Sequence, residues 1–558
     1  MKPISNAYLG SHRRTSFVGG FVTILAMGLI LAFAVAANAG VVTKHTAGTD
    51  VGLTSAWGTG SGPLPATGDV ATWSGSSLGG TLTNSIAQTW GAIDIEGATA
   101  PLIMNGQPLT LSGGQTINSV ANSGLYLAAA GQDLTITNNI TNSASMTWTV
   151  GSGRTLTPVG KILNLGTYTL TLSGTGTNWV QDSYTGSGNI VVNGPVYIVN
   201  SSGSGRSGTT TLNSGTISIF NNSTALGTGA LYLNGGTIGS ASSAGRTAAN
   251  AVFIGGDVTF GYSTGTLTFS GGTDLGGANR TLIINADATF STIAVANGGI
   301  IKAGTNTLTL STANTFSGGL TVQAGMVSLS SPSAAGTGTV TLGVAGDATS
   351  GTLNLSAGTR NIYGLATAGT AANQIIGTSG SSAVTLNYAG ATTNTFGGVI
   401  EDTLNAGTGT IGVTINNTNA ILTLSGANTY TGPTTVTNGT LLVTGSLAST
   451  TNSVTVAGGT LGGTGTIGGP TTVNSAGTLT VGGSTGTTMS TLAFGTNLSL
   501  AGNTILRLKK GGSPSSDSIT SGGTLAFGGT LTLSSVGSTL AANDSFTIFS
   551  AGGTGVFA

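Results

Sequence analysis

The chain has 558 residues, including 97 glycines and no cysteine, and it carries 14 basic and 14 acidic residues. Charged residues make up only 5% of the chain, against about 25% in ordinary soluble domains, so it offers no basic stripe of the kind that binds nucleic acid. The lack of cysteine excludes a disulfide framework and thiolate metal sites. Hydrophobic residues reach 38% and alternate with polar ones, which favours a buried core over disorder.

The N-terminal segment has the features of an export signal. A basic stretch at residues 2–14 precedes an uncharged apolar run at residues 17–36, and Ala37-Asn38-Ala39 supplies the small-x-small cleavage pattern. We therefore expect residues 1–39 to be a signal peptide, with the mature chain beginning at Gly40. Because the apolar run approaches the roughly 20 residues of a membrane-spanning helix, an uncleaved anchor is the alternative.

Residues 40–110 are less regular than the rest of the mature chain. All five tryptophans lie in the first third of the sequence, and prolines interrupt this segment at uneven intervals. A stack of strands exposes unpaired edges at its end, and bulky irregular segments commonly cover such an edge. We predict an irregular N-terminal cap and the first coils over residues 40–110.

One pair of acids in this region is the best hint of an enzyme. Asp94 and Glu96 lie two residues apart on a predicted strand and would share a face, with Trp90 nearby. Glycan cleavage needs carboxylates that converge on one groove, so these three residues form a candidate carbohydrate site. The simpler interpretation places both acids in solvent on the outer face, flanking inward Ile93 and Ile95.

Short alternating strands fill residues 111–510. In one example Leu308 and Leu310 would point to one face and Thr307 and Thr309 to the other. Strands recur about every ten residues between glycine-rich turns, which favours stacked coils of about 20–25 residues over a series of sandwich domains. We predict an all-β chain that folds as a parallel β-helix, or β-solenoid.

Two segments, 305–330 and 420–445, repeat one another most clearly. Asparagine, aromatic and glycine residues recur at matching positions, namely Asn314, Phe316, Gly318 and Gly325 in the first copy and Asn428, Tyr430, Gly432 and Gly439 in the second. We expect the asparagines at turns, where the amide bonds the backbone or tolerates positive φ. The aromatics would pack at a corner, and the glycines would turn the chain at positive φ.

These two segments resemble the autotransporter-associated β-strand repeat of bacterial passenger regions. The resemblance implies a right-handed parallel β-helix that is presented at, or released from, the cell surface, and it brings no catalytic residues. The tail from Asp517 to Phe549 resembles the end of such passengers, and residues 511–558 are expected to form C-terminal coils. The sequence stops at Phe557-Ala558 inside an unfinished strand-turn unit, which is compatible with a truncated gene or a fragment and a missing C-terminal anchor.

The functional prediction is a structural, adhesin-like passenger without catalysis, metal or cofactor. Its partners would be glycans or other surface or matrix proteins, and not nucleic acid. His45 is the one histidine expected in the mature chain, and the basic cluster of Arg507, Lys509 and Lys510 is interpreted as a solvated face. The alternative function is a carbohydrate-active enzyme or carbohydrate-binding β-helix.

Overall fold

A computed structural model describes residues 40–558 except 46–47, 59, 61, 160–161, 181–182, 200–204, 221–223, 294–297, 370–373, 483–486 and 551. The predicted signal peptide, with Ala37 and Ala39, lies outside the described residues. Within them, no helix has the length and apolar character needed to cross a membrane. The one helical element among them is a short 3-10 segment, η1 (Thr54–Ala56).

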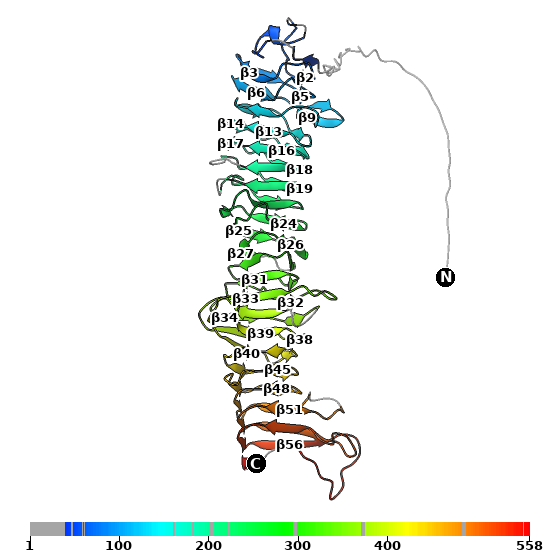
Figure 1. The fold of residues 1–558 in the computed structure, drawn as a ribbon, viewed down its shortest axis with the longest axis vertical. Helices are drawn as coiled ribbons and strands as arrows, with labels where there is room; N and C mark the ends of the chain where they lie inside the picture. Colours follow the sequence, from blue (N-terminus) through cyan, green and yellow to red (C-terminus); the bar gives the residue numbers. More distant parts are fainter. Residues whose placement is uncertain are drawn as a thin grey trace, which may run out of the picture. The chain divides into compact units, whose positions relative to one another are not determined.

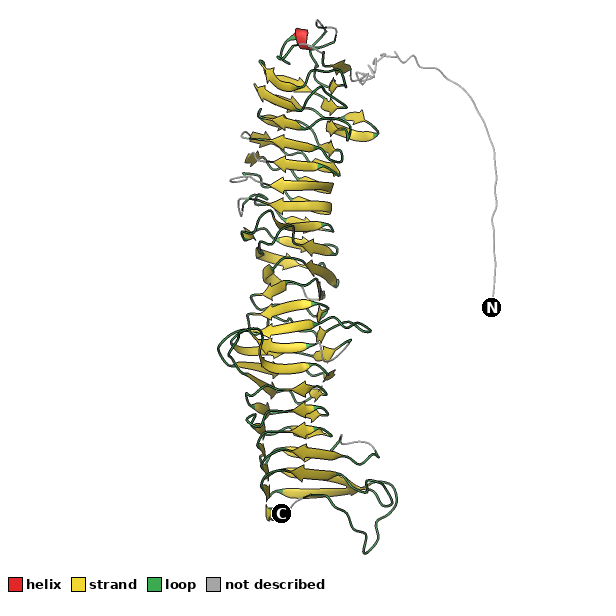
Figure 2. Cartoon of the chain, in the orientation of Figure 1, coloured by secondary structure: helices red, strands yellow, loops and turns green. Residues whose placement is uncertain are grey.

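The strands stack in parallel coils (Figures 1 and 2). The largest sheet holds 31 strands. These are β1 (Val41–Thr43), β2 (Val70–Trp73), β3 (Gly80–Asn84), β5 (Ala92–Ile95), β6 (Leu102–Gly106), β8 (Gln115–Ile117), β9 (Val120–Leu127), β10 (Leu134–Ile136), β12 (Met146–Val150), β13 (Thr155–Pro158), β15 (Leu170–Gly174), β16 (Thr177–Val180), β18 (Ile190–Val199), β19 (Thr210–Ile219), β20 (Leu231–Leu233), β21 (Thr237–Ser240), β22 (Arg246–Ala248), β23 (Val252–Ile254), β24 (Val258–Phe260), β25 (Leu267–Asp274), β26 (Arg280–Ile284), β27 (Ala288–Ile293), β28 (Ile300–Ala303), β29 (Thr307–Leu310), β30 (Leu320–Val322), β31 (Gly325–Leu329), β32 (Val340–Leu342), β33 (Gly351–Leu355), β35 (Leu365–Thr367), β36 (Ile375–Thr378) and β39 (Val399–Thr403).

Four smaller sheets complete the described strands. One contains β4 (Gln88–Trp90), β7 (Leu109–Leu111), β11 (Ile140–Asn142), β14 (Ile162–Asn164) and β17 (Ser183–Thr185). The second contains β34 (Gly358–Ile362), β37 (Val384–Tyr388), β40 (Ile411–Ile415), β43 (Thr434–Val436), β46 (Val454–Val456), β49 (Thr471–Val473), β52 (Leu498–Leu500), β55 (Leu525–Phe527) and β57 (Thr554–Gly555). The third contains β38 (Thr393–Phe396), β41 (Ile421–Leu424), β44 (Thr440–Val443), β47 (Thr460–Gly463), β50 (Thr478–Thr480), β53 (Asn503–Leu508) and β56 (Thr530–Ser535), and the fourth β42 (Ala427–Asn428), β45 (Ser446–Leu447), β48 (Thr466–Ile467), β51 (Thr491–Phe494) and β54 (Ser518–Ser521).

Successive coils stack in register. Ile190 lies beside Thr210, and Thr210 lies beside Leu231, so partners on adjacent coils are 20 or 21 residues apart here. The parallel β-solenoid predicted from the sequence is confirmed. Because every coil pairs with both neighbours, backbone hydrogen bonds along the axis and a continuous core hold the fold together, and each coil depends on the next.

The core follows the predicted alternation. In β29, Leu308 and Leu310 are fully buried, whereas Thr307 and Thr309 are partly exposed. One cluster of buried hydrophobic side chains extends from Val51 to Leu525. Burying a leucine of this kind contributes about 1.5–3 kcal/mol, so the repeated inward leucines, isoleucines and valines supply the main stabilising term.

A hairpin departs from the stack near the N-terminal end. Of the strand pairs that the described residues form, β8 with β9 is the one antiparallel pair, and Figure 1 shows it standing out beside the early coils. Asn118 and Ser119 form its turn at φ of +47° and +68°. Ile117 packs with Val70 and Ala92 in a second small apolar cluster, so the hairpin covers part of the outer face of β2 and β5.

Candidate functional sites

The three residues of the candidate carbohydrate site do not meet at one surface. Trp90 is fully buried, its ring lies 5.7 Å from that of Trp57, and its Nε1 donates to Gln88 Oε1 at 2.6 Å. A sugar cannot stack on a ring that fills the core, so the carbohydrate alternative for Trp90 is wrong, and the ring fills the first coils instead. The short sequence distance between Trp90 and Asp94 had suggested proximity, but Trp90 belongs to β4 and Asp94 to the next strand, β5.

Asp94 is buried beneath the β8–β9 hairpin. Its neighbours on adjacent strands are Thr72 and Tyr126, and only 8% of the residue is exposed. Thr72 Oγ1 donates to Asp94 Oδ2 at 3.5 Å, while Asp94 Oδ1 has no hydrogen-bond partner. Burial, followed by the negative charge of Glu96, raises the pKa of Asp94 to about 7.

The solvated interpretation is therefore wrong for Asp94 and right for Glu96. Glu96 is exposed and accepts a hydrogen bond from Asn118 Nδ2 in the hairpin turn. Ile93 and Ile95 are fully buried on the inner face, as expected. Sequence reasoning missed the hairpin that buries Asp94 and leaves Glu96 exposed. The turn-forming residues Asn118 and Ser119, between Ile117 and Val120, were the local signal for it.

The repeat asparagines connect three successive coils. Asn314 is buried, its Oδ1 accepts from Ile293 N at 2.7 Å, and its Nδ2 donates to Ala334 O at 2.7 Å. Asn428 Oδ1 likewise accepts from Ile400 N at 3.0 Å, and its Nδ2 donates to Ser446 O at 3.2 Å. The amides thus satisfy backbone groups of the coils on both sides, which is the backbone bonding expected of them, although Asn428 lies in strand β42 and not in a turn.

The repeat aromatics fill the interior. Phe316 and Tyr430 are 0% and 1% exposed. The Tyr430 hydroxyl and Thr434 Oγ1 lie 2.8 Å apart, so the polar end of the ring has a partner inside the coil. Burial raises the pKa of Tyr430 to about 12. These contacts make the aromatic position of the repeat a packing position.

The four repeat glycines fall into two kinds. Gly325 and Gly439 have φ of +67° and +71°, a region that side chains disfavour. Gly318 and Gly432 do not have positive φ, so the expectation of a left-handed turn is wrong for these two. Instead, a Cβ at Gly432 would lie 2.5 Å from Ile411 O. The close approach of the neighbouring coil, and not the backbone conformation, excludes a side chain there.

We expect Gly432→Ala to loosen the coils on either side of it by about 1–3 kcal/mol, the usual cost of overpacking. Hydrogen exchange of peptides covering β40 and β43 measures the change. Gly272→Ala is the matched control, because a Cβ there has no heavy atom within 4 Å and the backbone φ is not positive. Equal protection of β40 and β43 in both variants would contradict the close-approach argument.

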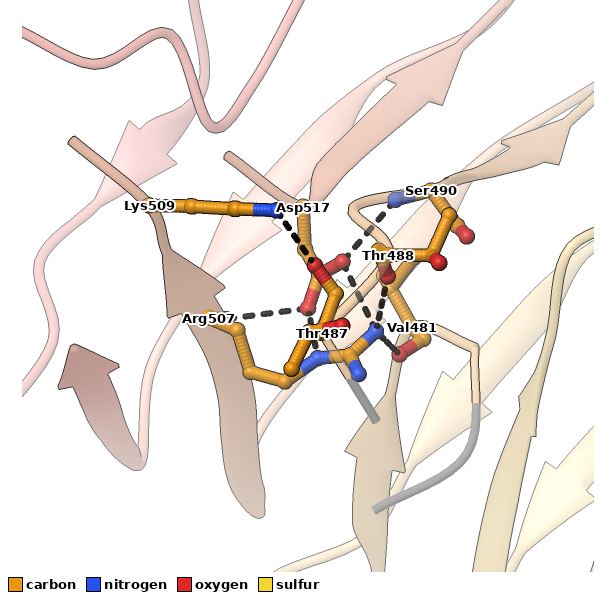
Figure 3. A network of polar contacts seen from close by, with 7 residues as sticks. All are labelled: Val481, Thr487, Thr488, Ser490, Arg507, Lys509 and Asp517. Carbon is orange, nitrogen blue, oxygen red and sulfur yellow. Dashed lines mark hydrogen bonds and ion pairs between the residues drawn. The ribbon is translucent and has the colours of Figure 1, made fainter. Parts of the chain in front are cut away.

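A buried ion pair connects three segments towards the C-terminal end (Figure 3). Arg507 Nε and Nη2 donate to the two oxygens of Asp517 at 2.7 and 3.0 Å, and the side chains are 8% and 0% exposed. The N–H groups of Ser490 and Arg507 donate to the same carboxylate, each at 3.0 Å. Arg507 Nη2 also donates to the carbonyls of Val481 and Thr488. The network thus ties Asp517 to backbone groups of neighbouring segments.

The interpretation of Arg507 as part of a solvated basic cluster is wrong, because Asp517 neutralises it inside the fold. Of the two lysines in this cluster, Lys510 is exposed and Lys509 is partly exposed. Lys510 pairs with Asp544 at 3.1 Å, and Lys509 Nζ donates to Thr487 O at 3.3 Å. The three basic residues therefore do not present one charged face.

Besides Arg507, the described residues bury four cations that were not anticipated, Lys44, Arg206, Lys302 and Arg360. Lys302 and Arg206 illustrate how they are held. Lys302 Nζ donates to the carbonyls of Gly304 and Ala324 at 2.6 and 2.7 Å, and burial lowers its pKa to about 8. Arg206 donates to several carbonyls, including that of Leu226 at 2.7 Å. Lys302 and Arg206 each satisfy main-chain carbonyls inside the stack. Within the described part of the chain, no group of three or more histidine, cysteine, aspartate or glutamate side chains is placed to hold a metal ion.

The repeats match a known family model. The passenger-associated-transport-repeat matches residues 300–329 and 419–443, the two segments in which the repeat was recognised from sequence. No curated protein and no solved structure was found to match the chain. The repeat and the β-solenoid together fit an exported passenger domain.

Proposed function

We propose that this chain is an exported, adhesin-like structural rod of the bacterial cell surface or matrix, and that it has no catalytic activity. The observation that supports this proposal best is the position of the two passenger-associated-transport-repeats. Their asparagines and glycines join adjacent coils, so the residues that define the repeat serve the stack itself.

The outer faces support the same proposal. Outward positions on the strands are mostly threonine, serine and asparagine, as in the column Thr414, Thr435, Thr455, Thr472 and Ser499. Such a surface offers hydroxyl and amide groups at the spacing of stacked strands, about 4.8 Å. It suits many weak contacts along an extended surface, with glycans or with other surface or matrix proteins as partners.

Export and the absence of catalytic activity can both be tested on the full chain produced in a bacterial host. We expect the protein outside the cell or on its surface, with Gly40 as the first residue by N-terminal sequencing if residues 1–39 are a cleaved signal. A version without residues 1–39 is the control and should stay in the cytoplasm. The purified protein should release no reducing ends from a panel of polysaccharides. Retention of the full chain in the cytoplasm, or release of sugars that Asp94→Asn abolishes, would overturn the proposal.

A further inference from the structure

One outer face of the early coils carries two exposed aromatic residues side by side. Tyr232 on β20 lies in register with Phe253 on β23, and each is 36% exposed. The ring centroids are 4.9 Å apart and the ring planes differ by only 14°. Most exposed large apolar side chains on a soluble protein occur singly, so a stacked pair of rings at the surface is unusual.

The positions before and after the pair carry shorter side chains. Thr211 precedes Tyr232 in the same column, and Asp274 follows Phe253. The two rings cover one face of each other, and each residue remains 36% exposed. The pair therefore forms an apolar platform that is two coils long.

A series of amides runs beside this platform. Asn213 Nδ2 donates to Asn193 Oδ1 at 2.9 Å, and Asn234 Nδ2 donates to Asn213 Oδ1 at 2.9 Å. All three asparagines are exposed. Each bond holds an amide in a fixed orientation and leaves one N–H and one oxygen lone pair for other partners. The amides are thus preorganised at the spacing of one coil, about 4.8 Å.

The series ends at a glycine beside Phe253. A Cβ at Gly255 would lie 2.2 Å from Asn234 Oδ1, so only a glycine at this position lets the Asn234 amide keep its orientation at the end of the series. Gly256 follows, where a Cβ would lie 2.2 Å from the main-chain oxygen of Asn234, so the two coils approach closely at this point. The charged residues at the border are Asp257, Asp274 and Arg280, whose Nε donates to Leu275 O at 3.0 Å. The net charge at the border is therefore negative, which disfavours an anionic ligand.

We propose that this aromatic–amide face, formed by Tyr232, Phe253, Asn193, Asn213 and Asn234, binds a neutral, extended glycan chain. The apolar faces of the sugar rings would contact the aromatic platform, and their hydroxyl groups would bond the oriented amides. One sugar unit of an extended β-linked chain is about as long as the 4.8 Å rise of one coil, so a chain along the stack could repeat the contact. This inference deepens the proposed adhesin-like role by naming its ligand class.

The test is binding of cellohexaose and chitohexaose to the purified full chain by isothermal titration calorimetry. We expect at least one of these neutral probes to bind, and the double variant Tyr232→Ala with Phe253→Ala to bind it at least ten-fold more weakly. Asn213→Ala should weaken binding severalfold, because it breaks the amide series at its centre. Tyr232→Phe keeps the ring and should retain most of the affinity.

The controls distinguish binding at this face from nonspecific binding by exposed aromatic residues and from loss of binding through misfolding. Tyr168→Ala removes another exposed aromatic, 38% exposed, and should bind like the parent protein. Circular dichroism should show unchanged β-structure in every variant. Absence of binding to both neutral probes, equal binding by the double variant, or preference for polygalacturonate over the neutral probes would each overturn the proposal. Because purified protein is used, failure here is distinguishable from failure of export.

Discussion

Asp94→Asn is expected to remove most of the pH dependence of the N-terminal coils between about pH 4 and pH 7. Burial raises the pKa of Asp94 from 3.8 in its ordinary state to about 7 in the folded chain. The folded state therefore keeps a proton that the unfolded chain releases. The free energy of unfolding is highest below the unfolded pKa and falls as pH rises towards the folded pKa, by about 4 kcal/mol in total.

Tryptophan fluorescence can follow this effect locally, because Trp57, Trp73 and Trp90 are buried in the same coils. Denaturant midpoints measured at several pH values should fall steeply in the parent protein and stay nearly level in Asp94→Asn. Glu96→Gln should give a smaller fall than the parent, since the charge of Glu96 is the second cause of the raised pKa. A fall of unchanged size in Asp94→Asn would assign the pH dependence to another group.

Asp517→Ala is expected to destabilise the coils around the Arg507 network by about 3–5 kcal/mol, the usual cost of leaving one partner of a buried ion pair alone. The variant removes the two carboxylate oxygens that accept from the guanidinium and from two backbone N–H groups, and leaves the guanidinium with carbonyl acceptors alone. Because a solenoid opens locally, hydrogen exchange of peptides from β51, β53 and β54 is the appropriate measurement.

The surface pair supplies the control for this prediction. Asp544→Ala breaks the partly exposed contact with Lys510 and should leave exchange in β53 unchanged, since exposed pairs contribute little. Adding Arg507→Ala to Asp517→Ala should cost less than the sum of the two single changes, because the second change removes the charge that the first left unpaired. Strict additivity would argue against a coupled network.

The repeat residues show which features the local sequence pattern can predict. Leu308 and Leu310 could be assigned to the core because strand alternation is a local property. The role of Asn428 as a backbone-bonding amide was also predictable, but its partners Ile400 and Ser446 were not. Gly432 was predicted to need glycine because of a positive φ, but the actual reason is the close approach of Ile411 O. Nothing in the sequence around Gly432 reveals that approach.

The candidate sites depended still more on the tertiary structure. Trp90 and Asp94 are four residues apart, yet one fills the core and the other lies under a hairpin. No motif in the sequence around Tyr232 or Phe253 connects the two residues. They form a platform only because they are one coil length apart, which puts them in register on adjacent strands.

By itself, the sequence determined an all-β chain with an apolar inner face, a polar uncharged outer face, glycine-rich turns and two passenger-associated repeats. Only the tertiary structure decided which residues of different coils meet. The physical reason is coil length: partners on adjacent coils are 20 residues apart at Asn193 and Asn213 but 29 apart at Asp402 and Thr431. Insertions between strands change the spacing of partners on adjacent coils without altering the alternation within each strand. Alternation therefore identifies which side chains face inward, and only the folded stack determines which residues of adjacent coils lie side by side.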